Sequence, residues 1–234
     1  VVFQGNDIRD QNLEIAMFQE LASAPATMQG SKTADLFGSL KGNSTRQADA
    51  KQAYTQAYLQ GEKTWVRLPK DRWPADWHGM KDPVVPLLRA LYGHPQCGAF
   101  WEQHCEKHLK AQGFVPIQNW RSCFWHPELG VYLVIYVDDF KLAGPLAQIE
   151  KAWDRIRLPN KEAQTPGIEL DNPEKLGRYV GCDHQEFECE VDWHGDPVIA
   201  MSGASGGMGS ASASRDAALN IPPTPPYKSR GKRK

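Results

Sequence analysis

The sequence lacks any long hydrophobic run. No stretch of eighteen apolar residues occurs among its 234 residues, whereas a membrane-spanning helix needs about 20. This excludes a protein whose helices cross a membrane. The chain also begins without an initiator methionine and without a basic segment followed by an apolar one, the pattern of a secretory signal. We therefore expect the first residue to be a cut edge of a longer protein.

The chain has few cysteines and a small net charge. Five cysteines are an odd number, and without a secretory signal they favour free thiols in a reducing compartment, which leaves cytoplasm and nucleus equally open. The formal net charge is −1, and without the five positive charges of residues 228–234 the rest of the chain carries −6. The body of the protein therefore lacks the basic surface that is typical of a dedicated nucleic-acid binder.

The last part of the chain is poor in apolar residues that could form a core. Residues 201–214 are almost entirely Gly, Ser, Ala and Met, and a proline-rich stretch and a basic end follow. Such a composition cannot bury enough apolar surface to offset chain entropy, so we expect 201–234 to be a disordered tail. For the basic end, three interpretations stay open: a nuclear address, a phosphate-binding tail, or sequence without a function.

Hydrophobic patterns predict a sheet with amphipathic helices. Residues 96–112 read as a helix, because apolar side chains recur every four residues and Gly113 stands where a C-terminal cap belongs. Residues 122–125 and 131–137 predict a hairpin whose second strand is apolar on both faces, as in a central strand covered above and below. Residues 140–143 resume as a strand, and residues 146–156 form another amphipathic helix.

Two adjacent carboxylates, Asp138 and Asp139, follow this apolar strand. Burying unpaired charge is costly, so such a pair favours either a bound cation or a solvent-exposed hairpin turn, where Asp is common. A third acid, Asp49, lies far upstream in its own short extended segment before a helical one. Hard divalent cations such as Mg²⁺ prefer carboxylate oxygens that converge from separate segments. The three acids are therefore candidate metal ligands.

The apolar strand leads into the tetrapeptide Tyr136-Val137-Asp138-Asp139. Five further blocks lie along the chain: Gln47 to Tyr54, Trp65 to Pro69, Leu91 to Gln96 leading into Trp101, Gln112 to Phe114, and Leu176 to Gly181. In these blocks and their order the chain resembles, over roughly residues 1–187, the reverse transcriptase of copia-type retrotransposons, whose most recognisable tetrapeptide is the one at 136–139.

The resemblance implies an α+β fold, a polymerase palm with an antiparallel sheet and helices packed on one face. It divides the chain into a partial fingers region (1–48), the palm with the catalytic aspartates (49–158), the end of the palm and start of the thumb (159–200), and the tail (201–234). Ribonuclease H and integrase segments are expected elsewhere in a full-length polyprotein.

The activity implied by the resemblance is RNA-directed DNA polymerisation on a primed RNA or DNA template from deoxynucleoside triphosphates. Asp49, Asp138 and Asp139 would be catalytic and would hold two Mg²⁺ ions, with Mn²⁺ as a possible substitute. Tyr54 and Gln96 would bind the incoming nucleotide, Tyr54 as a steric gate against a 2′-hydroxyl. Tyr136 and Val137 would line the path of the primer and template.

Departures from the family pattern support an alternative, a catalytically inactive nucleic-acid-binding remnant of such an element. Where the family has Gln-Ala-Pro-Arg, this chain has Gln96-Cys97-Gly98-Ala99 and so lacks a cation near the template. The upstream fingers segment that grips the triphosphate would precede Val1. We therefore expect this chain to be a weak or inactive polymerase.

Two weaker patterns indicate other chemistry. Gly203-Ala204-Ser205-Gly206-Gly207 fits the nucleophile elbow of hydrolases, but the segment after it lacks the apolar face of a helix. Histidines and cysteines gather at residues 104–108 and 182–194, but neither group has the paired Cys-x-x-Cys knuckles of a structural zinc site. For both groups we favour packed or surface histidines beside buried thiols.

Overall fold

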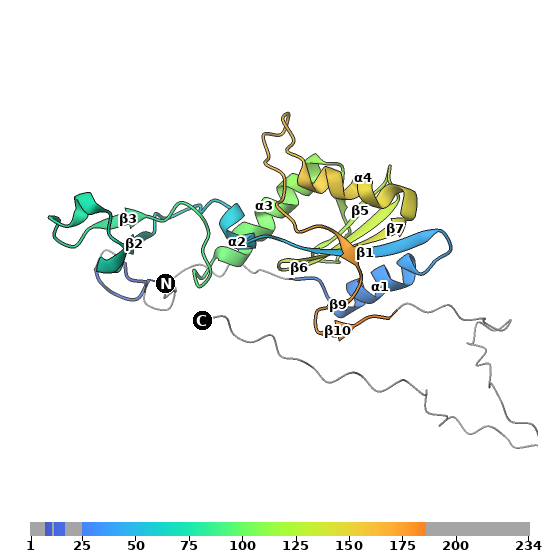
Figure 1. The fold of residues 1–234 in the computed structure, drawn as a ribbon, viewed down its shortest axis with the longest axis horizontal. Helices are drawn as coiled ribbons and strands as arrows, with labels where there is room; N and C mark the ends of the chain where they lie inside the picture. The colour runs from blue at the N-terminus through green and yellow to red at the C-terminus, as the bar shows by residue number, and fades with distance from the viewer. Residues whose placement is uncertain (1–7, 11, 17–24, 186–234) are drawn as a thin grey trace, which may run out of the picture. The chain divides into compact units, whose positions relative to one another are not determined.

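The computed structural model describes residues 8–10, 12–16 and 25–185, and the predicted tail lies outside them. The central element is a six-stranded sheet in the order β4-β5-β6-β7-β1-β8, and every neighbouring pair is antiparallel (Figure 1). Its strands are β1 (Asn43–Asp49), β4 (Val115–Pro116), β5 (Cys123–His126), β6 (Val131–Tyr136), β7 (Asp139–Pro145) and β8 (Glu174–Lys175). Among the described residues, no helix is long and apolar enough to cross a membrane.

The remaining elements are helices and short strand pairs. The α-helices are α1 (Met28–Gly38), α2 (Ala53–Gln56), α3 (Cys97–Ala111) and α4 (Leu146–Arg157), and two 3₁₀ turns are η2 (Lys70–Arg72) and η3 (Ala75–Trp77). Strand β2 (Trp65–Arg67) pairs with β3 (Val84–Pro86), and β9 (Arg178–Tyr179) with β10 (Cys182–Asp183). The helices expected at 96–112 and 146–156 are confirmed to within a residue or two. The apolar residues Leu13, Ile15 and Ala16 also suit the start of a helix, but residues 13–16 contain none.

Helices cover both faces of the sheet, so the expectation that they pack on one face is wrong. On one face, side chains of β6 and β7 such as Leu133 and Phe140 form the main core with Trp101 of α3 and Trp153 of α4. On the other face, the alternate side chains of β6 and β7 form a second cluster with α1. Figure 1 shows α3 and α4 on one side of the sheet and α1 on the other. The physical reason is that β6 is apolar on both faces, so both must be covered.

A buried lysine fastens α1 to the sheet. Lys141 of β7 is fully buried, and its ammonium donates to Asp35 at 2.5 Å and to the hydroxyl of Ser31 at 3.0 Å, both on α1. It also lies 4.6 Å from the ring centre of Tyr179. Burial lowers the pKa of Lys141, and the hydrogen bond and charge of Asp35 oppose that change. The cation therefore depends on its partner from α1 to remain charged inside the protein.

Replacing Lys141 by alanine should destabilise the fold by about 3 kcal/mol, because it removes the ammonium that Asp35 and Ser31 bind and opens a cavity. Urea unfolding followed by circular dichroism measures this. The matched control is Lys151→Ala on the exposed side of α4, which should change the free energy of unfolding by less than about 0.5 kcal/mol. Equal effects of the two substitutions would show that Lys141 is not a structural anchor.

Candidate active site

Strand register brings two of the three candidate acids together. In the β1–β7 pair Asp49 lies directly opposite Asp139, and directly opposed residues of antiparallel strands project from the same face. Because side chains alternate along a strand, Asp139 shares its face with Lys141, on the side of α1. The sequence placed Asp139 in an interruption between strands, whereas the structure places it as the first residue of β7.

The third acid, Asp138, lies in the turn between β6 and β7. The last pair of this hairpin is Tyr136 with Asp139, so Val137 and Asp138 make a two-residue loop. Asp138 is exposed and its carbonyl accepts a 2.7 Å hydrogen bond from the N–H of Ala50, which follows Asp49. This bond ties the turn to the end of β1. It holds the backbone of the adjacent acids in one place.

The turn has a strained backbone. Val137 has φ of 58°, in the left-handed region that β-branched residues rarely adopt, and such a conformation costs about 1–3 kcal/mol. The buried indole of Trp101, on α3, donates a 2.7 Å hydrogen bond to the carbonyl of Val137. Short hairpin loops favour positive φ because it matches the twist of the strands. The geometry of the hairpin thus requires the strained conformation of Val137, and the hydrogen bond from Trp101 of α3 stabilises it.

The carboxylates raise one another's pKa. Burial raises the pKa of Asp139 to about 6, and the charges of Asp138 and Asp49 and a hydrogen bond with the Asp49 side chain add to the effect. Burial and the charges of Asp138 and Asp171 also raise the pKa of Asp49, while its hydrogen bond with Asp139 opposes the rise. The two carboxyls therefore titrate as a coupled pair above the ordinary range of aspartate. A cation at this place would relieve the repulsion.

The carboxylate oxygens of the three acids are ligands that suit a hard divalent cation. Their arrangement meets only part of what a metal site requires. Asp49 and Asp139 lie within hydrogen-bonding reach, and Asp138 is close enough to change the pKa of both. Within the described residues, however, no group of three or more His, Cys, Asp or Glu side chains is arranged to hold a metal ion. Two of the acids are thus paired, and the third is near them without converging on a common point. The same finding applies to the histidines and cysteines at 104–108 and at 182 and 184.

Sequence reasoning missed Asp171, which belongs to the surroundings of this site. Its N–H donates to the Asp49 carbonyl at 2.9 Å, and its charge contributes to the raised pKa of Asp49. The ammonium of Lys51 lies 3.5 Å from the Asp171 carboxylate. Asp171 stands in a loop far along the chain from Asp49, and no sequence pattern marks it. Only the pairing of loop and strand reveals it.

Tyr54 lies near the acids, on α2. Its ring centre is 4.9 Å from that of Tyr92, and it packs against the main core. Burial raises its pKa to about 12, and the charges of Cys97, Tyr92 and Asp138 contribute. The phenol is therefore neutral at physiological pH and close enough to Asp138 to interact with it electrostatically.

The other predicted site residues are spread around the hairpin and α3. Gln96 is the N-cap residue of α3, where its side chain makes no capping hydrogen bond and its N–H donates to His94 Nδ1 at 3.2 Å. It precedes Cys97, one of the groups near Tyr54. Tyr136 is the last residue of β6, half-buried beside the acids. Ser205, Cys189 and His194 lie outside the described residues. The four described cysteines are free thiols, as expected.

Stability should fall as the pH rises from about 4 to 6, because Asp139 binds a proton in the folded protein at a pH where the unfolded chain has released it. Asp139→Asn should flatten this slope and stabilise the protein at pH 7 by on the order of 1 kcal/mol, after allowance for solvent screening. Chemical denaturation across this pH range measures it. Asp154→Asn, an exposed acid on α4, should leave the slope unchanged; a wild-type slope of the opposite sign would refute the assignment.

Trp101→Phe should destabilise the protein and speed amide exchange in the 137–138 turn, because it removes the hydrogen bond to Val137. The lost hydrogen bond accounts for about 1 kcal/mol beyond the cost of the smaller ring. Trp153→Phe is the matched control, since Trp153 is also fully buried and its indole nitrogen has no hydrogen-bond partner. Hydrogen–deuterium exchange compares the two. Equal exchange in the turn would show that Trp101 does not support it.

Comparisons of the chain with known protein families, with curated proteins and with solved structures found no match.

Proposed function

We propose that this chain is the palm region of an RNA-directed DNA polymerase of the copia-type retrotransposon class, including part of the fingers and the start of the thumb. The observation that carries the proposal is the placement of Asp49 opposite Asp139, with Asp138 in the adjoining turn. Asp49 lies far along the sequence from the adjacent pair Asp138 and Asp139, and the three acids are the residues that the family pattern selects.

The neighbouring residues fit the roles that the family pattern assigns to them. Tyr54 is held by Tyr92 and the core within electrostatic range of Asp138, which suits a rigid gate beside a bound nucleotide sugar. Tyr136 and Val137 adjoin the acids, where a primer end would have to lie. Burial raises the pKa of Asp139 and of Asp49, and the charges of the neighbouring acids raise it further; bound Mg²⁺ or Mn²⁺ would relieve that repulsion. Bound there, the divalent ions would activate the primer hydroxyl and neutralise the triphosphate.

A specific observation favours the second candidate, a nucleic-acid-binding remnant without catalytic activity. No three acidic, histidine or cysteine side chains in the described part of the chain converge as a metal site requires. A carboxylate triad that fails to close around ions would bind them weakly. Catalysis requires the metal ligands to be in place. The two candidate functions therefore share the fold but differ in their affinity for metal ions and in whether they catalyse primer extension.

Primer extension on an RNA template with Mg²⁺ or Mn²⁺ tests the polymerase proposal. We expect weak, template-dependent extension that Asp138→Asn reduces at least about 100-fold, because it removes one charge from the site. Mn²⁺ binding followed by electron paramagnetic resonance should weaken in the same variant. Asp76→Asn, in η3, should change neither quantity. Mn²⁺ binding and extension that do not depend on Asp138 would refute the active site, and binding of primed template without extension would favour the remnant.

A further inference from the structure

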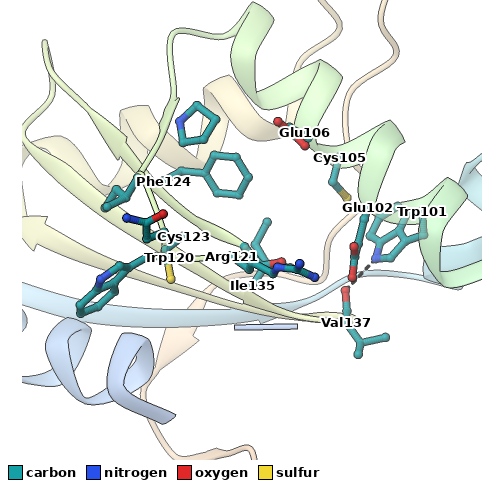
Figure 2. A pocket seen from close by; sticks show the side chains of 14 residues that line it. Trp101, Glu102, Cys105, Glu106, Trp120, Arg121, Cys123, Phe124, Ile135 and Val137 are labelled. Carbon is teal, nitrogen blue, oxygen red and sulfur yellow. Dashed lines mark hydrogen bonds between the residues drawn. The ribbon is translucent and has the colours of Figure 1, made fainter. Parts of the chain in front are cut away.

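Three consecutive carbonyls at the candidate catalytic turn are held by three different parts of the chain. The indole of Trp101 on α3 donates to the carbonyl of Val137 at 2.7 Å, and Figure 2 shows this bond at the edge of a cavity beside α3. The next carbonyl, that of Asp138, accepts at 2.7 Å from the backbone N–H that follows β1. The third carbonyl, that of Asp139, accepts from the hydroxyl of Tyr179 at 3.3 Å. Tyr179 belongs to β9, far along the chain from the acids.

Tyr179 lies on the face of the sheet from which the acids project. Its ring centre is 4.6 Å from the ammonium of Lys141, which meets α1. Asp139 projects from the same face, because it lies two residues before Lys141 in β7. Tyr179 is 3% exposed, and burial raises its pKa, so the phenol keeps its proton. A hydroxyl has one proton to donate, and the carbonyl of Asp139 is closer to it than that of Val134, which lies at 3.5 Å.

Residues 174–184, which we call the strap, carry Tyr179 and are fastened to β1 at their first end. The strap begins with β8, which pairs with β1, and Figure 1 shows β9 and β10 on the side of the sheet that α1 covers. The buried side chain of Gln47 on β1 binds the strap twice. Its amide nitrogen donates to Glu174 at 3.1 Å, and its amide oxygen accepts from the N–H of Gly177 at 3.2 Å. Gln47 lies two residues before the acid of β1, so it projects from the same face.

A histidine fastens the other end of the strap to α1. The backbone N–H of His184 donates to the carbonyl of Gly177 at 2.8 Å, and its Nδ1 lies 3.1 Å from the same oxygen. Because a carbonyl only accepts, Nδ1 carries a proton there. The other ring nitrogen, Nε2, lies 3.3 Å from the carboxylate of Asp35 and 3.5 Å from the ammonium of Lys141. It accepts from Lys141 when the ring is neutral and donates to Asp35 when the ring is protonated, so both forms hold the strap.

The place of Asp139 in the sheet explains why such a support matters. Asp139 is the first residue of β7, and its partner Asp49 is the last residue of β1. The ends of elements fray most readily, and like charges at this end add repulsion. A side chain that binds a metal ion or a substrate has to keep its position to within about 0.5 Å. A hydrogen bond to the backbone of Asp139 limits fraying at the residue whose carboxylate would bind the ion.

We propose that Tyr179 is a positioning residue for Asp139 and that the strap places Tyr179 against β7. Its hydroxyl holds the carbonyl of Asp139 from the face of the acids, while Trp101 holds the carbonyl of Val137 from the face of α3. The carboxylate of Asp139 is thereby kept opposite Asp49, where a divalent ion would bind. This inference rests on the proposed function, because the position of the carboxylate matters for the binding of a metal ion.

Tyr179→Phe in the full chain tests the proposal, because it removes the hydroxyl and keeps the ring. The carbonyl ¹³C resonance of Asp139 should move upfield in NMR spectra, since a carbonyl that loses a hydrogen bond is less polarised. Mn²⁺ binding followed by electron paramagnetic resonance should weaken about fivefold, the equivalent of one neutral hydrogen bond.

Tyr132→Phe is the matched control for the hydroxyl. Tyr132 is also buried on the side of α1, and its hydroxyl donates to the carbonyl of Gly30 at the same distance of 3.3 Å. The two substitutions should lower the Tm by similar amounts, whereas only Tyr179→Phe should weaken Mn²⁺ binding. An equal loss of Mn²⁺ affinity in both variants would show that Tyr179 acts through stability alone and would overturn the proposal.

His184→Leu tests whether the strap places Tyr179, because it removes the side-chain bonds to Gly177, Asp35 and Lys141. Hydrogen–deuterium exchange at residues 177–179 should become faster, and Mn²⁺ binding should weaken about as much as in Tyr179→Phe. His78→Leu, at an exposed position after η3, should change neither quantity. Unchanged exchange and unchanged Mn²⁺ affinity in His184→Leu would show that the strap does not place Tyr179.

The outcomes separate this inference from the proposed function. If the wild type binds Mn²⁺ and Tyr179→Phe binds it equally well, the inference fails and the proposed function stands. The inference also fails if the carbonyl resonance of Val134 moves in place of that of Asp139. If the wild type neither binds Mn²⁺ nor extends a primer, the proposed function fails. The resonance of Asp139 then still decides whether Tyr179 holds its backbone.

Discussion

The antiparallel register of β1 and β7 is the constraint on which the rest of the site depends. It sets Asp49 opposite Asp139, and a slip by one residue would move one of the two to the other face of the sheet. The register is fixed by the alternation of β7, whose Phe140 and Leu142 face one core while Lys141 meets α1. The acids are therefore positioned by the same packing that stabilises the sheet.

Concentrating three carboxylates at the end of these strands opposes folding. The raised pKa of Asp139 and Asp49 reflects burial and mutual repulsion. The left-handed conformation of Val137 adds backbone strain. The charge repulsion and the backbone strain both occur where β6 turns into β7. Hydrogen bonds from Trp101 of α3 and from Ala50 hold the backbone of this turn. The hairpin accounts for the strain, but nothing in the packing of the sheet requires the charges, and like charges gathered in one place of an otherwise well-packed fold are typical of a functional site.

The two faces of the sheet differ in chemistry at this end. The face toward α1 carries the acids and, farther along β7, a buried lysine paired with Asp35. The face toward α3 carries the main core. Trp101 belongs to that core and supports the turn. A single side chain thus links the packing of the core to the backbone of the candidate catalytic turn.

Local pattern was sufficient for the two long helices, for the central hairpin and for the choice of candidate acids. The apolar run of β6, the four-residue repeat of α3 and the acids that follow β6 are visible in the sequence, because periodicity and burial act over a few neighbouring residues. Pattern alone did not show which side of the sheet each helix covers, because a strand that is apolar on both faces accepts helices on either. That strand explains why helices could be expected on one face of the sheet, although α1 covers the other.

Only the tertiary structure determined the surroundings of the acids. Asp171 meets Asp49 through a loop that no motif marks, and the indole of Trp101 reaches Val137 from another element. The pairing of Asp49 with Asp139, and the position of Asp138 near them without full convergence, follow from register and turn geometry. The sequence determined which acids are candidates for the chemistry, whereas the distances among them depend on contacts between segments far apart in the chain, which local propensity does not specify.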